Sequence, residues 1–292
     1  MKQSIVAART TPLLIVATTA IGFAAVAQAG SKIATSQASP KQVPTSELLG
    51  ELKAAPKQNT ARQNKLIALF RQAGARPADI RLQQVWPLQN RRSSDPVLNN
   101  IIVTKKGMAP GVIVVGAHFD KVASGSGVID NWSGAAMVAN LYQTLRPLQT
   151  RHTFQFVGFA YEEQGTLGSR DFLVPMLNAE RRGIKAMVNL ECLGVDGPFL
   201  WTNGSHDKLE AFARSVAAAN KLPLQSHDLP NVSSDSAPFA RYGIPVIGFD
   251  GLAVERLSLI HSERDQWGAI NPTRYAATYK LLTQFLRALD KR

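Results

Sequence analysis

The sequence predicts an α/β fold with a mostly parallel, mixed central sheet that is covered by helices on both faces. Short apolar runs alternate along the chain with longer segments of helical periodicity, and this alternation is typical of a parallel sheet. The apolar run Val112–Gly116 lies between glycines and reads as a strand buried on both faces. The chain has 292 residues, 45% of them hydrophobic, and no internal repeat, so we expect one large domain.

Residues 1–29 read as a secretory signal peptide. Lys2 and Arg9 form a basic start, residues 10–28 are uncharged, and Ala27-Gln28-Ala29 is a small-x-small cleavage motif. The alternative is a membrane anchor, but the stretch is short for a span and rich in alanine and threonine. We therefore expect export to the periplasm or the exterior and no transmembrane helix in the mature chain. A flexible leader is expected over residues 30–45, and a single domain over residues 46–292.

The first elements of this domain are predicted from capping and periodicity. Ser46 is the predicted N-cap of a short helix. Apolar residues recur at helical spacing within Thr60–Ala73, which predicts a second helix. Ile80–Val85 and Asn100–Val103 read as strands.

From residue 112 onward, strands and helices alternate. The further predicted strands are Val112–Gly116, Thr153–Ala160, Ala186–Leu190 and Val246–Phe249. The further predicted helices are Ser133–Leu145, Leu167–Leu177, Leu209–Asn220 and Thr273–Leu289. The last of these helices is amphipathic and closes the domain.

The chain is basic, with a formal net charge of +12 that falls by two, to +10, without Lys2 and Arg9. Its lysines and arginines are spread along the sequence and no nucleic-acid-binding motif is present, so we expect no nucleic-acid partner. A basic exported protein is suited to anionic envelope surfaces. Cys192 is the only cysteine, which excludes an intramolecular disulfide, and its apolar setting favours a packing role over a nucleophilic one.

Acidic and histidine side chains follow the predicted strands at the point where each strand ends. His118 follows Val112–Gly116, Glu162 and Glu163 follow Thr153–Ala160, and Glu191 follows Ala186–Leu190. Asp130 opens the helix after a Gly/Ser loop, and His261 lies in the last loop before the closing helix. Ligands of open α/β sheets bind beyond the carboxyl ends of the strands, so these residues are expected to converge there. Taken singly, each has a structural interpretation, such as an N-cap for Asp130.

Together these residues provide enough donors for two divalent metals. If Asp130 bridges, one metal has His118, Asp130 and Glu191, and the other has Asp130, Glu163 and His261. In an extended segment Glu162 points away from Glu163, which leaves Glu162 free as a general base. Asp120 is the predicted carboxylate partner of the His118 ring, and Asp265 has a similar supporting role.

These motifs resemble the co-catalytic zinc aminopeptidase family, which includes bacterial leucyl aminopeptidases and the glutamate carboxypeptidase catalytic domain. The resemblance runs from about residue 99 to residue 289 and rests on the ordered segments Gly116–Asp120, Asp130–Ala136, Tyr161–Gly165, Asn189–Glu191, Ser234–Phe239 and Ile260–Ser262. It implies a zinc-exopeptidase-like fold, two Zn²⁺ with Co²⁺ or Mn²⁺ as substitutes, peptide substrates with a free N-terminus, and a cis Asp130–Asn131 bond. Two positions depart from the pattern: many relatives have Asp at Glu191 and His at Ser236.

Three alternatives stay open beside an exported metallo-aminopeptidase. A carboxypeptidase of the same family would use the same metals. A glutaminyl cyclase shares the fold but uses one zinc, and its relatives have Trp where this chain has Ile260. A non-catalytic binding module is disfavoured, because such members lose ligands and this chain retains all five together with Glu162. The sequence does not predict the oligomeric state.

Overall fold

The computed structural model describes residues 41–86 and 97–292, so the predicted signal peptide lies outside the described residues. Helices α1 to α8 are Thr45–Lys53, Asn59–Gln72, Ser133–Leu145, Leu167–Leu173, Asn178–Gly183, Asp207–Ala219, Ser236–Arg241 and Pro272–Leu289. Strands β1 to β8 are Ile80–Gln84, Asn99–Lys105, Val112–His118, Thr153–Phe159, Ile184–Glu191, Phe199–Trp201, Gln225–His227 and Val246–Asp250.

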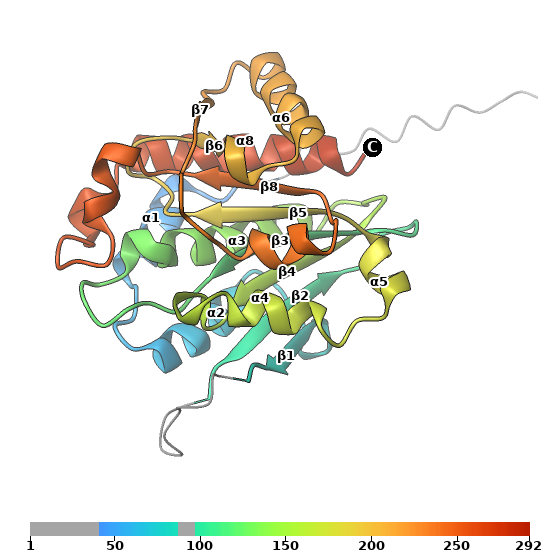
Figure 1. Cartoon of the computed structure of the whole chain (residues 1–292), viewed down its shortest axis with the longest axis horizontal. Coiled ribbons are helices and arrows are strands. Elements are labelled where there is room, and N and C mark those ends of the chain that lie inside the picture. Colours follow the sequence, from blue (N-terminus) through green and yellow to red (C-terminus); the bar gives the residue numbers. More distant parts are fainter. Residues whose placement is uncertain (1–40, 87–96) are drawn as a thin grey trace, which may run out of the picture. The chain divides into compact units, whose positions relative to one another are not determined.

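The strands of the described chain form one sheet in the order β1-β2-β4-β3-β5-β8-β6-β7 (Figure 1). The central strands β4, β3, β5 and β8 are parallel, whereas β2 runs antiparallel to β4 and β6 runs antiparallel to β8. The predicted mostly parallel mixed sheet is therefore confirmed.

Helices cover both faces of the sheet. On one face α3 packs on β3, β4 and β5 and contacts α1, α2 and α8, while α4 and α7 cover the other face. Strand β3 is buried on both sides, because Ile113 and Val115 belong to the larger core and Val114 to the smaller one. This explains why its sequence is a continuous apolar run rather than an alternating pattern.

Several predicted boundaries differ from the structure. Helix α1 begins at Thr45 after Pro44, so Ser46 is not its N-cap. The predicted leader includes Val43, but Val43 is buried and its N–H donates to the Tyr279 hydroxyl over 2.9 Å. Helix α4 ends at Leu173, and the chain then forms α5, which was not predicted. Within residues 41–86 and 97–292, no helix has both the length and the apolar character needed to cross a bilayer.

The carboxyl ends of the parallel strands lie along one edge of the sheet. His118 ends β3 and pairs with Phe159 of β4, while Glu191 ends β5 and pairs with Asp250 of β8. The loops after these strands, together with the loop before α8, carry the predicted site residues.

Candidate metal centre

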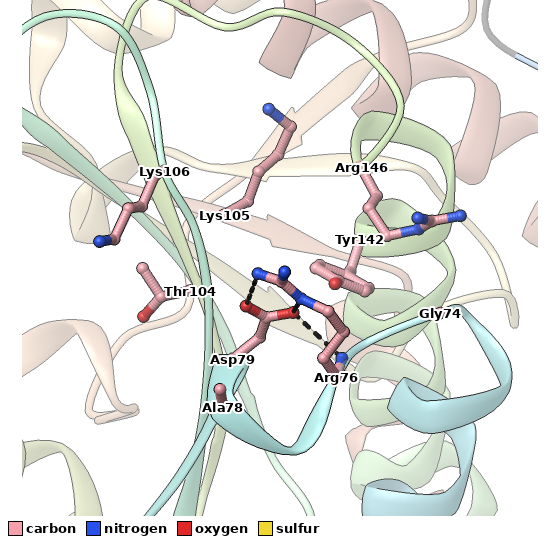
Figure 2. A pocket seen from close by; sticks show the side chains of 9 residues that line it. All are labelled: Gly74, Arg76, Ala78, Asp79, Thr104, Lys105, Lys106, Tyr142 and Arg146. Carbon is pink, nitrogen blue, oxygen red and sulfur yellow. Dashed lines mark hydrogen bonds and ion pairs between the residues drawn. The ribbon is translucent and has the colours of Figure 1, made fainter.

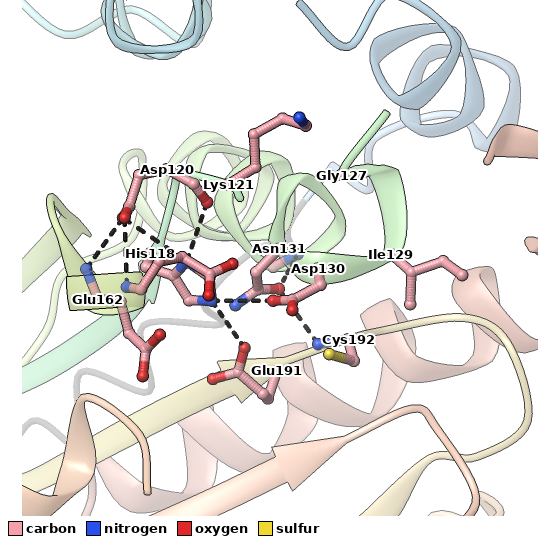
Figure 3. A network of polar contacts seen from close by, with 12 residues as sticks. His118, Asp120, Lys121, Gly127, Ile129, Asp130, Asn131, Glu162, Glu191 and Cys192 are labelled. Carbon is pink, nitrogen blue, oxygen red and sulfur yellow. Dashed lines mark hydrogen bonds and ion pairs between the residues drawn. The ribbon is translucent and has the colours of Figure 1, made fainter. Parts of the chain in front are cut away.

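His118 is the buried centre of the site. Its Nε2 lies 3.1 Å from Oδ1 of Asp130 and 3.1 Å from Oε1 of Glu191 (Figure 3). Its Nδ1 lies 3.1 Å from the backbone carbonyl of Asp120. The ring is therefore held by backbone on one side, and its other nitrogen faces two carboxylates.

Asp130 faces two imidazoles. While its Oδ1 faces His118, its Oδ2 lies 3.0 Å from Nε2 of His261, which in turn lies 3.0 Å from Oε2 of Glu163. The donor atoms of His118, Asp130 and Glu191 lie within 4.8 Å of one another, as do those of Asp130, Glu163 and His261. These are the two ligand sets predicted from the sequence. All five side chains meet at one place, although Glu163 and His261 are far from His118 in sequence.

The backbone around Asp130 is held by Asp265. The Asp265 carboxylate accepts the N–H of Ile129 over 2.7 Å and the N–H of Asp130 over 3.1 Å. Asp265 thus supports Asp130 through its backbone and does not contact a histidine ring of the described chain. The Asp130–Asn131 peptide bond is cis, as the resemblance implied.

Asn131 links this turn to β5. Its side chain accepts the N–H of Gly134 over 3.0 Å and the N–H of Cys192 over 3.2 Å, and it donates to the Leu190 carbonyl over 2.9 Å. A Cβ atom at Gly134 would lie 2.4 Å from Asn131 Oδ1 and 2.7 Å from the Leu190 carbonyl. Glycine is therefore required at the start of α3, because it lets that helix approach the end of β5.

Asp120 contacts both the His118 ring and the turn that carries the two glutamates. Its carboxylate lies 3.7 Å from Nδ1 of His118, while it accepts the backbone N–H of Glu162 over 3.1 Å and that of Glu163 over 3.3 Å. Figure 3 shows the contacts from Asp120 to both His118 and Glu162. Asp120 therefore fixes the turn that carries the two glutamates, and the His118 ring binds its carbonyl.

The Glu162–Gln164 segment is a 3₁₀ turn, so the condition of an extended segment, from which the opposite directions of the two glutamates were argued, is not met. A turn also separates neighbouring side chains, and only Glu163 joins a donor cluster. Glu162 remains a carboxylate beside that cluster.

Burial dominates the electrostatics of the carboxylates. Burial raises the pKa of Glu162 to about 9 and that of Glu163 to about 7, and it also raises the pKa of Glu191. Burial acts in the same direction on Asp130, but hydrogen bonds from His118 and His261 take the pKa of Asp130 below its usual range. The Asp130 contact raises the pKa of His261 to about 9. Neighbouring carboxylates thus compete for protons, which is typical of a site built to bind cations.

Two buried charged residues near the site, Arg62 and Asp235, had no role predicted from the sequence. The Arg62 guanidinium on α2 donates to the carbonyls of Phe119, Ser126 and Gly127. Asp235 precedes α7 and is fully buried, and neither of its carboxylate oxygens has a hydrogen-bond partner among the described residues. Burial raises the pKa of Asp235 to about 7, and the charge of Asp235 in turn raises the pKa of Glu162. Asp235 lies within Ser234–Phe239, one of the segments on which the family resemblance rests, so a signal for it was present in the sequence. No sequence pattern distinguishes Arg62 from a surface arginine.

The two departures from the family pattern are accommodated locally. Glu191 Oε2 accepts from the Asn189 side chain over 3.1 Å, and the Ser236 hydroxyl pairs with that of Ser234 at 2.9 Å. His227 lies apart from the donor clusters, 3.5 Å from Asp250 and stacked on Phe199.

A family model described as peptidase family M28 matches residues 100–286. Leupeptin-inactivating enzyme 1 of Streptomyces exfoliatus is 28% identical over 196 residues, which is 66% of this chain and 44% of that protein. The chain therefore spans less than half the length of this relative.

Two solved structures share the fold. A zinc aminopeptidase from Bacillus subtilis is 24% identical with a TM-score of 0.62, covering 67% of this chain and 51% of that chain. A glutaminyl cyclase from an Acidobacteriales bacterium is 17% identical with a TM-score of 0.69, covering 89% of this chain and 99% of that chain.

Proposed function

The chain belongs to peptidase family M28, and from this premise we propose that it is an exported metallo-aminopeptidase that removes residues from the free N-terminus of peptides. The observation that carries the proposal is the position of Asp130 between two imidazoles. Each of its carboxylate oxygens lies 3.0–3.1 Å from a different histidine, and each histidine has a second carboxylate beside it. A carboxylate in this position is suited to bridging two metals.

The donor set fits two zinc ions. Imidazole and carboxylate oxygen are ordinary zinc ligands, and Co²⁺ or Mn²⁺ accepts the same donors. The buried Glu163 Oε1 has no hydrogen-bond partner among the described residues, although an unpaired buried oxygen is costly. When bound, two such ions would activate a water and stabilise the charge that develops on the substrate carbonyl.

We assign the proton transfer to Glu162. Its backbone N–H is held by Asp120, and its carboxylate is absent from both donor clusters. In its ionised form, a buried carboxylate of raised pKa is a stronger base than an exposed one, which suits it to accept a proton from water and pass it to the leaving amine. Glu191 and Glu162 also provide negative charge for the ammonium group of a peptide N-terminus.

The experiment compares hydrolysis of a panel of aminoacyl anilides by the wild-type protein and by Glu162→Gln, each with and without chelator. Glu255→Gln is the matched control, because Glu255 is exposed. We expect chelator-sensitive activity that zinc restores, a loss of about 10²-fold or more in Glu162→Gln, and no loss in the control. Elemental analysis is expected to find two metals per chain in all three proteins.

Other results would select the alternatives. Release of C-terminal residues from N-acetylated peptides would indicate a carboxypeptidase. A single bound metal with cyclisation of N-terminal glutamine would indicate a glutaminyl cyclase. Two bound metals without turnover of any peptide would indicate a binding module. Export predicts that the mature protein begins at Gly30, which N-terminal sequencing of the protein from its native host tests.

A further inference from the structure

At the edge of the sheet opposite the candidate metal centre, hydrogen bonds connect chain segments that are distant in sequence. The β2–β3 connection is joined to the segment before β4 by a hydrogen bond from Lys105 Nζ to the Thr150 hydroxyl at 2.9 Å and by one from the Ala109 N–H to the Arg151 carbonyl at 2.8 Å. The start of α6 is joined to β8, where the His206 N–H donates to the Val246 carbonyl over 2.8 Å. In Figure 1 this edge lies on the side of α5 and the label C, and we call it the basal edge.

The first of two pockets on the basal edge is strongly basic (Figure 2). It has a volume of about 600 Å³, and its cationic lining residues are Arg76, Lys105, Lys106 and Arg146. Asp79 is the one carboxylate among its described lining residues, and both of its oxygens are bound by the Arg76 guanidinium over 2.8–2.9 Å. The pocket therefore has an excess of positive charge.

The second pocket has the same character. It has a volume of about 470 Å³ and includes Arg151, Lys185, Lys208 and Arg292, with no carboxylate among its described lining residues. The nearby Asp290 is buried, and its carboxylate accepts the backbone N–H groups of Arg151 and His152. The positive charge of this pocket is thus not offset from within.

Exposed apolar side chains lie among these cations. Met108 lies two residues after Lys106 and is 73% exposed, and Leu177, just before α5, is 71% exposed. Tyr242, just before β8, is 48% exposed, and the Arg181 guanidinium lies 4.5 Å from its ring centroid. These three side chains place apolar and aromatic surface on the same edge of the sheet as the positive charge.

We propose that the basal edge docks on an anionic lipid bilayer. Lysine and arginine near a membrane are attracted to the phosphate groups of acidic lipids, while a few apolar or tyrosine side chains insert at the boundary between headgroups and acyl chains. A polyanionic polymer or nucleic acid would satisfy the cations and leave Met108 and Leu177 in water. Docking in this way turns the metal centre, at the opposite edge, toward the solution that holds the substrates.

The test is co-sedimentation of the protein with phosphatidylcholine vesicles that contain or lack phosphatidylglycerol. The charge variant is Lys106→Glu with Lys185→Glu, and the matched control is Lys57→Glu with Lys280→Glu, since all four side chains are exposed. Both variants have the same net charge. We expect the basal pair to weaken binding to phosphatidylglycerol vesicles by about 30-fold or more, and the control pair to weaken it by less than about threefold. Equal losses in the two variants would overturn the proposal, because attraction would then follow net charge alone.

A second variant separates a bilayer from other anions. Met108→Ser with Leu177→Ser is expected to weaken vesicle binding by about tenfold, and the loss is expected to persist at high salt because it reflects apolar burial. Val254→Ser is the control on a different surface segment. If this double variant binds vesicles as the wild type does, or if dextran sulfate competes equally well for both proteins, the basal edge is a general polyanion site and the bilayer assignment is wrong. Urea midpoints equal to the wild type exclude misfolding, and no step depends on peptidase activity.

Discussion

Arg62 is expected to stabilise the fold more than any surface arginine of α2. Its side chain is fully buried, and it donates to three carbonyls of the segments that precede Asp130, those of Phe119, Ser126 and Gly127. The guanidinium carbon also lies 5.3 Å from the Trp132 ring centroid. Burial lowers the pKa of Arg62 to about 10, so it remains charged at neutral pH. It is therefore a buried cation beside the acidic cluster.

Arg62→Met removes this cation and leaves the carbonyls without their donor. Breaking a buried charge arrangement by removing one partner costs about 3–5 kcal/mol, and we expect a loss of this size in the free energy of unfolding. Arg62→Lys retains the charge but loses the planar fork that serves several carbonyls at once, so about half of that loss is expected. Urea denaturation monitored by tryptophan fluorescence, with zinc and with chelator, measures both variants.

Arg71→Met is the matched control, because Arg71 is exposed on the same helix. It is expected to change the free energy of unfolding by less than about 0.5 kcal/mol. A loss below about 1 kcal/mol in Arg62→Met would refute the reasoning, since the methionine would then replace the buried cation without cost.

Three further outcomes follow from the same contacts. Burial raises the pKa of Glu51 to about 7, so its contribution to stability is present below its ordinary pKa of 4.5 and is lost as the pH rises through 7. Urea denaturation at about pH 8 should therefore find Glu51→Gln more stable than the wild type by up to about 3 kcal/mol. This difference should vanish near pH 4. Asp120→Asn replaces one of the two oxygens that hold the Glu162 and Glu163 backbone; we expect kcat to fall by about 10–100-fold with two metals still bound, and an unchanged kcat would contradict that role. His261→Ala removes a proposed ligand of one metal only, so elemental analysis is expected to find one metal per chain, whereas His206→Ala should retain two.

Much of the fold could be predicted because its central strands have a distinctive composition. Strands β3, β4, β5 and β8 are buried on both faces, so each forms a short apolar run that is recognisable in the sequence. The three-residue strands β6 and β7 were missed, since a segment that short has no readable period. Helix α7 has six residues, too few for a periodic pattern, and was missed for the same reason.

The site was predictable to the extent that its chemistry lies in side chains. His118, Glu163 and Glu191 were identifiable because each follows a buried strand, and parallel strands bring their ends together. Asp265 and Asn131 act on backbone N–H and carbonyl groups, which every residue has, so no spacing indicates their targets. The contacts of Asp120 with the backbone of Glu162 and Glu163 were not predicted for the same reason, whereas its carboxylate also lies 3.7 Å from Nδ1 of His118, the ring it was predicted to accompany.

The balance of charge at the site supports the proposal of two divalent cations. Glu162, Glu191 and Asp235 are carboxylates in a buried environment; the charges of Asp235 and Glu191 raise the pKa of Glu162, and the charge of Glu191 also raises that of Asp235. The hydrogen bonds of Arg62 go to backbone carbonyls, so they do not satisfy these carboxylate oxygens. Protonation of these carboxylates would relieve the repulsion between their charges, but the buried Glu163 Oε1 would still have no partner among the described residues. Cations held between His118, Asp130 and His261 would relieve both, since metal binding requires the carboxylates in their deprotonated form.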